Sequence, residues 1–326
     1  LKVEDNGTLK LGGNLILDKG FTSFQVQDEA LVEGSGGLVK TGPQTTVLKG
    51  TGTFAYEGDV FVQGGVLEIT NATGLGSTDA GTRVEQGAIL RISVDGESTP
   101  QGSPTKDAKI NEKITLAGGK LDLNGNYIDL KGGVVLKGKD VNSTIRVKDG
   151  SKDVFVRSTI SGKGGLIKTG QGFLRLGSRN SQQYQGETII KEGELRIADT
   201  TTLPESTDVL IEEKGKLRLQ GEGNKIQSLN GSGTLELFVS KSILTSGLSG
   251  KDDEFSGLIS GDGGFTKAGT GTTVLSGKNT YTGSTTIQQG TLKLGAVTGL
   301  PSASPVVVKP SGVLDLGGFE KEIIVD

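Results

Sequence analysis

A short motif, Gly-x-φ-x-φ with φ apolar, recurs along the chain, and several of its copies are separated by the same step. Pairs that begin 22 residues apart start at Gly65 and Gly87, Gly193 and Gly215, and Gly290 and Gly312. The copy at Gly87 departs slightly, since GAILRI carries one additional residue. Because apolar and polar positions alternate, each copy is predicted to be a strand with one buried face. A regular step between like strands is typical of a solenoid.

The copy GELRI shows how such a strand is expected to face. Leu195 and Ile197 are predicted to point inward, while Glu194 and Arg196 point to solvent. One coil later, Arg196 would stand beside Arg218, which is an unfavourable pair. The sequence therefore predicts an all-β fold, a parallel β-helix or β-solenoid. A β-propeller also repeats, but its blades need about 40 residues in four antiparallel strands.

Three longer segments open on a glycine pair and align with one another well beyond their first turns. They begin at Gly36, Gly164 and Gly263, and each later carries a tyrosine, at Tyr56, Tyr184 and Tyr281. The tyrosines are either a binding stripe or corner residues, and their equivalence across repeats favours corners. Glycine makes up 55 of the 326 residues, and it supplies the sharp bends where φ is positive. No Gly-X-Y period exists, so collagen is excluded.

The composition excludes several functional classes. The chain has no His and no Cys, so Ser-His-Asp and Cys-His catalysis and a zinc or haem site are not expected. Charged residues recur singly and alternate in sign, whereas polysaccharide-cleaving enzymes cluster their carboxylates. We therefore predict no enzyme, no cofactor and no metal. Net charge is −3 with both signs interleaved, and no run approaches about 20 apolar residues. Nucleic-acid binding and membrane insertion are not expected.

Two stretches lack the alternating pattern and are predicted to be loops within one domain that spans residues 1–326. They are Asp95–Lys113, which contains two prolines, and Ser240–Phe255, which carries an acidic cluster. Loops can vary without breaking a stack, so we expect partner binding there. The candidate contact residues are Glu97, Lys106, Asp107, Lys109, Asp252, Asp253 and Glu254.

The string GGxxKxGxGxxxLxGxxxYxGxTxIxxGxLxL resembles the passenger-associated transport repeat of bacterial type V autotransporters. The copy in Gly263–Leu294 matches most fully, Gly164–Ile197 matches well, and Gly36–Ile69 carries Pro43 where a glycine is usual. The resemblance implies a single-stranded, right-handed parallel β-helix that is exported through the periplasm and outer membrane. It also implies a signal peptide and a C-terminal β-barrel translocator, so we expect this chain to be a passenger fragment.

Two functions fit such a passenger. In the first, a monomeric, surface-displayed or secreted virulence factor, such as an adhesin, binds a host-cell surface protein or glycan. In the second, the chain is a passive stalk and folding scaffold for an N-terminal effector domain. A polysaccharide-active enzyme is a third, weaker alternative. The two predicted loops favour the first function, because a stalk has no need of them.

Overall fold

The computed structural model describes residues 1–326 except 19, 96, 99–103, 107, 152, 178–180, 199–200 and 324–326. In the described part, the regular structure is β-strand apart from one 3-10 turn, Val297–Gly299. None of the helical structure there is long and apolar enough to cross a membrane. The chain forms two compact units, Leu1–Leu166 and Ile167–Asp326, which are described separately. The single domain expected from the sequence stays a prediction.

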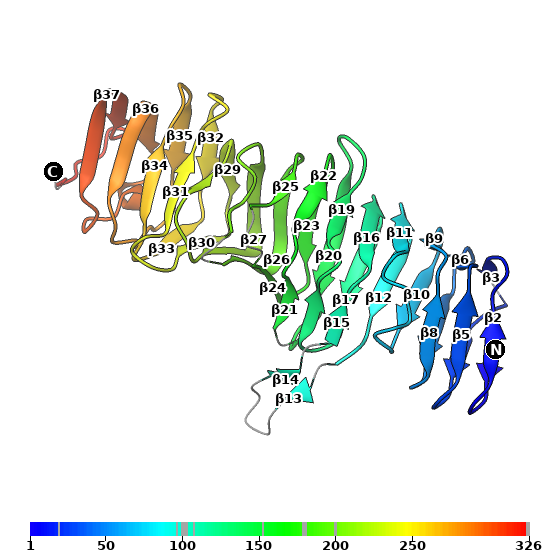
Figure 1. Cartoon of the computed structure of the whole chain (residues 1–326). Helices are drawn as coiled ribbons and strands as arrows, with labels where there is room; N and C mark the ends of the chain where they lie inside the picture. The colour runs from blue at the N-terminus through cyan, green and yellow to red at the C-terminus, as the bar shows by residue number, and fades with distance from the viewer. Residues whose placement is uncertain are drawn as a thin grey trace. The chain divides into compact units, whose positions relative to one another are not determined.

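In the first unit, the coils contribute short strands to parallel ladders, in which neighbouring strands come from successive coils (Figure 1). The first ladder contains β1 (Lys2–Val3), β4 (Ser23–Val26), β7 (Thr45–Lys49), β10 (Val66–Ile69), β12 (Ile89–Ile92), β17 (Lys120–Leu123) and β20 (Asn142–Val147). The second contains β2 (Thr8–Lys10), β5 (Leu31–Gly34) and β8 (Thr53–Tyr56), while β15 (Ala108–Ile110), β18 (Ile128–Leu130) and β21 (Val154–Val156) form a separate ladder. The third contains β3 (Leu15–Leu17), β6 (Leu38–Lys40), β9 (Val60–Val62), β11 (Gly81–Glu85), β16 (Lys113–Ala117), β19 (Val134–Leu136) and β22 (Ile160–Gly162).

The second unit also consists of parallel ladders. Some of its strands are longer and take part in two ladders. One ladder contains β24 (Phe173–Leu176), β26 (Thr188–Ile197), β27 (Asp208–Leu219), β30 (Thr234–Leu237) and β33 (Leu258–Gly261). Another contains β28 (Asn224–Lys225), β31 (Ile243–Ser246), β34 (Gly264–Lys267), β36 (Thr285–Leu294) and β37 (Val306–Asp315). The third runs from β27 through β29 (Ser228–Gly231), β32 (Asp253–Phe255) and β35 (Thr272–Leu275) to β36. Two further strands are β23 (Gly165–Thr169) and β25 (Gln183–Tyr184).

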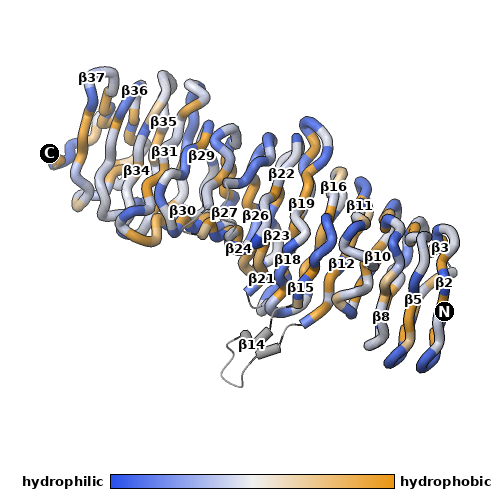
Figure 2. Tube along the Cα trace, viewed as in Figure 1, coloured by the Kyte–Doolittle hydropathy of each residue, from blue (hydrophilic) through white to orange (hydrophobic). Residues whose placement is uncertain are grey.

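The inward stack of the second unit follows the facing expected from the sequence. Leu195 and Ile197 are fully buried in β26, and Leu217 of β27 is the register partner of Leu195. Hydrophobic and hydrophilic segments alternate along the coils in Figure 2. Gly193 lies in the middle of this strand with φ of +69°, and a Cβ there would lie 2.3 Å from the carbonyl oxygen of Gly170. The motif glycine is therefore a corner that no other residue fits.

The aligned tyrosines are corner residues, because Tyr56, Tyr184 and Tyr281 are fully buried. The Tyr184 hydroxyl shares a 2.6 Å hydrogen bond with Thr188 Oγ1, which in turn bonds to Thr207 Oγ1 at 2.8 Å. Tyr281 makes the same relay through Thr285 and Ser304. A buried phenol cannot contact a partner, so the binding-stripe alternative is excluded.

The coil length varies more than the sequence motif indicates. Glu194 pairs with Lys216 at the expected step, but Lys216 pairs with Thr234 after a clearly shorter coil. Leu67 pairs with Leu90, one position beyond the regular step, which confirms the additional residue in the GAILRI copy. A solenoid tolerates this variation because each coil needs only its strands in register, while its turns can lengthen or shorten.

The two predicted loops are shorter in the structure than in the sequence analysis. Within residues 95–113, β13 (Glu97–Ser98) and β14 (Pro104–Lys106) form an antiparallel hairpin, which projects from the stacked strands in Figure 1. Ala108–Ile110 and Lys113 instead belong to the wall strands β15 and β16. Residues 240–255 contain the wall strands β31 and β32. The prediction was wrong there because serine and aspartate side chains point inward, which obscures the apolar alternation.

Candidate functional site

The predicted contact residues of the first loop lie on two elements. Glu97 on β13 is the register partner of Lys106 on β14, so the hairpin places these two positions opposite each other. Lys109 is exposed on the wall strand β15, next to Asp129 in β18. Asp107 lies outside the described residues. Recognition by this group stays a prediction.

The acidic cluster does not converge on one point. Asp252 is exposed, and its Oδ1 accepts a 2.7 Å hydrogen bond from the Thr272 amide. Asp253 is buried, its Oδ2 accepts from the Leu229 amide at 3.0 Å, and burial raises the pKa of its carboxyl. Glu254 is exposed again on the outer side of β32. Among the described residues, no group of three or more acidic side chains is placed to hold a metal ion.

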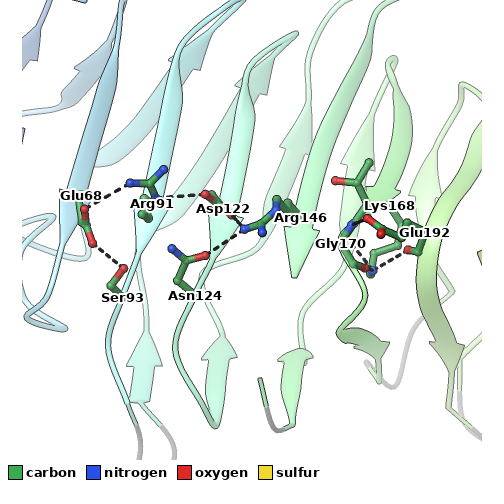
Figure 3. A network of polar contacts seen from close by, with 10 residues as sticks. Glu68, Arg91, Ser93, Asp122, Asn124, Arg146, Lys168, Gly170 and Glu192 are labelled. Carbon is green, nitrogen blue, oxygen red and sulfur yellow. Dashed lines mark hydrogen bonds and ion pairs between the residues drawn. The ribbon is translucent and has the colours of Figure 1, made fainter. Parts of the chain in front are cut away.

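The outer face of the first unit carries a ladder of alternating charge (Figure 3). Arg91 contacts Glu68 on one side at 3.4 Å and Asp122 on the other at 3.1 Å. Arg146 then donates to Asp122 Oδ1 at 2.8 Å. These four register partners sum to zero charge. The sequence predicts a solvated wall here, but Asp122 is buried between the two arginines, with only 4 % of its side chain exposed.

The corresponding face of the second unit differs, because three arginines follow one another. Arg175 of β24, Arg196 of β26 and Arg218 of β27 are successive register partners, and we call them the arginine ladder. The sequence analysis placed Arg196 beside Arg218 but missed the first arginine, Arg175. The signal was present, since GFLRL at residues 172–176 is a further copy of the strand motif.

Carboxylates on neighbouring positions make this ladder possible. Glu194 lies 2.6 Å from Arg196 Nε and 3.3 Å from Arg218 Nε, so the contact between these two arginines is compensated. Glu236 forms ion pairs with Arg218 and Lys216. Burial alone would raise the pKa of Glu236, but its hydrogen bonds to these cations hold the pKa below its usual value.

Aromatic rings fix two of the guanidinium groups. Arg196 lies over the ring of Phe173, 3.8 Å from the centroid, and Arg218 lies 4.6 Å from the centroid of Phe238. Such cation–π contacts contribute about 0.5–1 kcal/mol each at exposed sites. The guanidinium groups are thus held in place on the outer face, with Arg196 26 % exposed and Arg218 20 % exposed.

A shallow, open hollow of about 340 Å³ lies elsewhere in the second unit. Gln171, Glu192, Gly193 and Lys214 line it. Glu192 is already engaged, because its Oε2 accepts a 3.1 Å hydrogen bond from the Gly170 amide (Figure 3). The hollow offers little enclosure to a small ligand, since ligand sites are usually concave and largely apolar.

Each long repeat also buries a lysine that the sequence analysis did not single out. Lys168 is fully buried, and its ammonium donates to the carbonyls of Thr169 at 2.9 Å, Gly170 at 2.7 Å and Glu192 at 3.1 Å (Figure 3). The first two carbonyls belong to its own corner, and the third belongs to the next coil. The ammonium therefore joins consecutive coils through charge-assisted hydrogen bonds.

The other two repeats contain the same arrangement. Lys267 donates to the carbonyls of Ala268, Gly269 and Gln289, and Lys40 donates to those of Gly42 and Gly64. Burial lowers the pKa of both lysines. Each of the three lysines is the fifth residue of a repeat that opens on a glycine pair, in GGLVK, GGLIK and GGFTK. This shared position was the sequence signal that could have identified them.

Glu112 is a buried acid in the turn before β16. The residue is only 4 % exposed, and its Oε2 has no hydrogen-bond partner within the part of the chain that the structure describes. Burial raises the pKa of Glu112 to about 7. Burial also raises the pKa of Tyr56, and the charge of Glu112 adds to that increase.

We expect Glu112→Gln to raise the free energy of unfolding by about 2 kcal/mol at pH 8, because it removes a buried, unpaired charge. The folded-state pKa of about 7 exceeds the ordinary 4.5, so the contribution of Glu112 to stability is full below pH 4.5 and is lost as pH rises through 7. Urea denaturation at pH 4.5 and pH 8 measures this difference. The exposed Glu57→Gln variant is the control. An unchanged pH dependence in Glu112→Gln would contradict the assignment.

Comparison with known proteins places the repeats in a described class. The family model of the passenger-associated transport repeat matches residues 38–69, 166–197 and 265–294. The protein named Adhesin BmaC autotransporter, from Brucella suis biovar 1 (strain 1330), is 31 % identical over 187 residues, covering 56 % of this chain and 5 % of that protein. Probable autotransporter YfaL, from Escherichia coli (strain K12), is 24 % identical over 345 residues, covering 98 % of this chain and 25 % of that protein. The chain thus spans a quarter or less of these relatives. No solved structure matches the chain.

Proposed function

Because the chain is a segment of an autotransporter passenger, we propose that it acts outside the bacterium as a non-catalytic binder of host-cell surface molecules. Autotransporter passengers are exported to the cell surface or secreted through the outer membrane, with the help of their own C-terminal translocator. One relative carries the word adhesin in its name, which supports a binding function for this chain as well.

The hairpin β13–β14 is the observation that carries this proposal. It is an antiparallel pair inserted into a parallel stack. The coil that contains it runs from Ile89 to its register partner Lys120, and it is longer than the preceding coil, which starts at Val66. The stack itself needs no such insertion, and specific recognition tends to lie on segments that vary without disturbing the scaffold. We place the contact on this hairpin and the adjoining wall, with Glu97, Lys106, Asp107 and Lys109 as the contact residues.

We expect replacement of residues 97–106 with a short Gly/Ser connection to weaken binding to host cells strongly while leaving the thermal melt unchanged. The reason is that the wall strands β12, β15 and β16 keep their register without the hairpin. A flow-cytometric binding assay beside a melting curve measures both properties. A chain in which the hairpin sequence is scrambled at equal length is the matched control, and it should lose binding to the same extent.

Two other outcomes distinguish the alternatives. If the parent chain binds no host cell, the chain is a passive stalk that presents another part of the passenger. If the shortened chain binds as well as the parent, the contact lies elsewhere on the wall. The non-catalytic part of the proposal is supported by the absence of His and Cys from the sequence. Depolymerisation of a glycan by the purified chain would overturn it.

A further inference from the structure

We infer that the outer face of β24, β26, β27 and β30 binds a linear anionic polysaccharide. This inference rests on the proposed function, since it names the class of host molecule and a second place where it is bound. The arginine ladder is the observation that starts the argument. Three arginines occupy the same outward position on three successive strands, and in the first unit this pattern is replaced by strict alternation.

The face has an excess of positive charge. At these register positions, four cations stand against the two carboxylates Glu194 and Glu236, which leaves two positive charges. The cations are Arg175, Arg196, Lys216 and Arg218. In the first unit, the same count over two outward positions per strand adds Lys120 to the neutral ladder and leaves one positive charge. A local excess on a chain of net charge −3 identifies this face as the place where an anion is attracted.

The guanidinium groups are also held ready for binding. Arg196 rests on Phe173 and is paired with Glu194, and Arg218 rests on Phe238. Little side-chain entropy is lost when groups of this kind bind a ligand. Arginine donates in pairs to carboxylate and to sulfate-like oxygens, so both anionic groups of polysaccharides suit it.

The geometry favours a polymer over a small anion. Strands in a parallel ladder are spaced by about 4.8 Å, so the arginines form a line across the strands and do not converge on one point. Leu258 of β33, which is 37 % exposed and is the register partner of Thr234, lies beside this line and offers apolar contact area to sugar rings. A single-stranded nucleic acid fits less well, because bases stack on open aromatic faces, whereas Phe173 and Phe238 each carry a guanidinium.

Calorimetric titration of the chain with heparin oligosaccharide, at low and at high salt, tests the inference. We expect binding that weakens with salt, and we expect Arg175→Gln/Arg196→Gln to weaken it by about tenfold. Arg91→Gln/Arg146→Gln removes the same number of charges from the alternating ladder and should change affinity by less than about twofold. Thermal melts establish that both variants fold, and Arg175→Glu alone replaces the first variant if it does not.

Each remaining outcome decides the matter. Absent heparin binding, or equal losses in the two double variants, overturns the inference. Tighter binding of single-stranded DNA than of heparin overturns the polysaccharide assignment in favour of a nucleic acid. Host-cell binding measured in parallel separates the two proposals. Cells bound without heparin binding contradict only this inference, whereas heparin bound through the arginine ladder without cell binding supports it and contradicts only the proposed function.

Discussion

Lys168→Met is expected to lower the free energy of unfolding by about 4 kcal/mol. Methionine fills the same space but removes the ammonium from one buried and two partly buried hydrogen bonds, and an unsatisfied buried group costs about 1–3 kcal/mol. Part of this loss of stability comes from the contact between consecutive coils, because the third carbonyl belongs to Glu192 of the next coil. Urea denaturation followed by circular dichroism measures the change.

The control for this variant is a lysine on the outside of the same wall. Lys191 lies in β26, its side chain is 47 % exposed, and it contacts Glu212 at 3.7 Å. Lys191→Met should change stability by less than about 0.5 kcal/mol. If Lys168→Met were as mild as this control, the buried ammonium would contribute nothing, and the carbonyls would find other donors.

Leu195→Asp is expected to destabilise the chain by about 5 kcal/mol or to unfold the neighbouring coils. Leu195 is fully buried between Leu174 and Leu217 in the inward stack, so the new carboxylate has neither water nor a partner. Thermal and urea denaturation, with far-UV circular dichroism for the loss of strand, measure this effect.

The adjacent outward position gives the matched comparison. Arg196→Gln removes a charge but keeps the polar surface, and it should cost less than about 1 kcal/mol. The sequence analysis regarded Arg196 beside Arg218 as an unfavourable pair. The structure places Glu194 against Arg196, so aspartate would face a like charge there. Equal losses at positions 195 and 196 would contradict the inward and outward assignment.

Much of the wall could be predicted because its information is local. The period of two in GELRI determines which side chains face inward, and the regular step between motif copies brings Glu194 beside Lys216 as expected. The equivalence of Tyr56, Tyr184 and Tyr281 correctly indicated corners, since every repeat must bury the same position.

The remaining features depend on how one coil stacks on the next, which a short stretch of sequence does not reveal. The arginine ladder requires the register between β24 and β26, where Arg175 pairs with Arg196 one position short of the regular step, so a strict repeat misses it. The strand β32 escaped notice because Asp253 occupies an inward position that is usually apolar. The role of Lys168 depends on the carbonyl of Glu192, which reaches the ammonium only when two coils stack.

The buried lysines give the assembly of the coils a direction. Lys168 and Lys267 each donate to two carbonyls of their own corner, and Lys40 donates to one. The last acceptor of each lies later in the chain, at Glu192, Gln289 and Gly64 respectively. When the stack grows toward the N-terminus, the later coil is already folded. The lysine of each added coil can then donate its last hydrogen bond to that coil as soon as it packs. A coil added toward the C-terminus must bury its ammonium before the partner arrives. The repeats therefore favour vectorial assembly, in which growth from the C-terminal side meets the lower barrier.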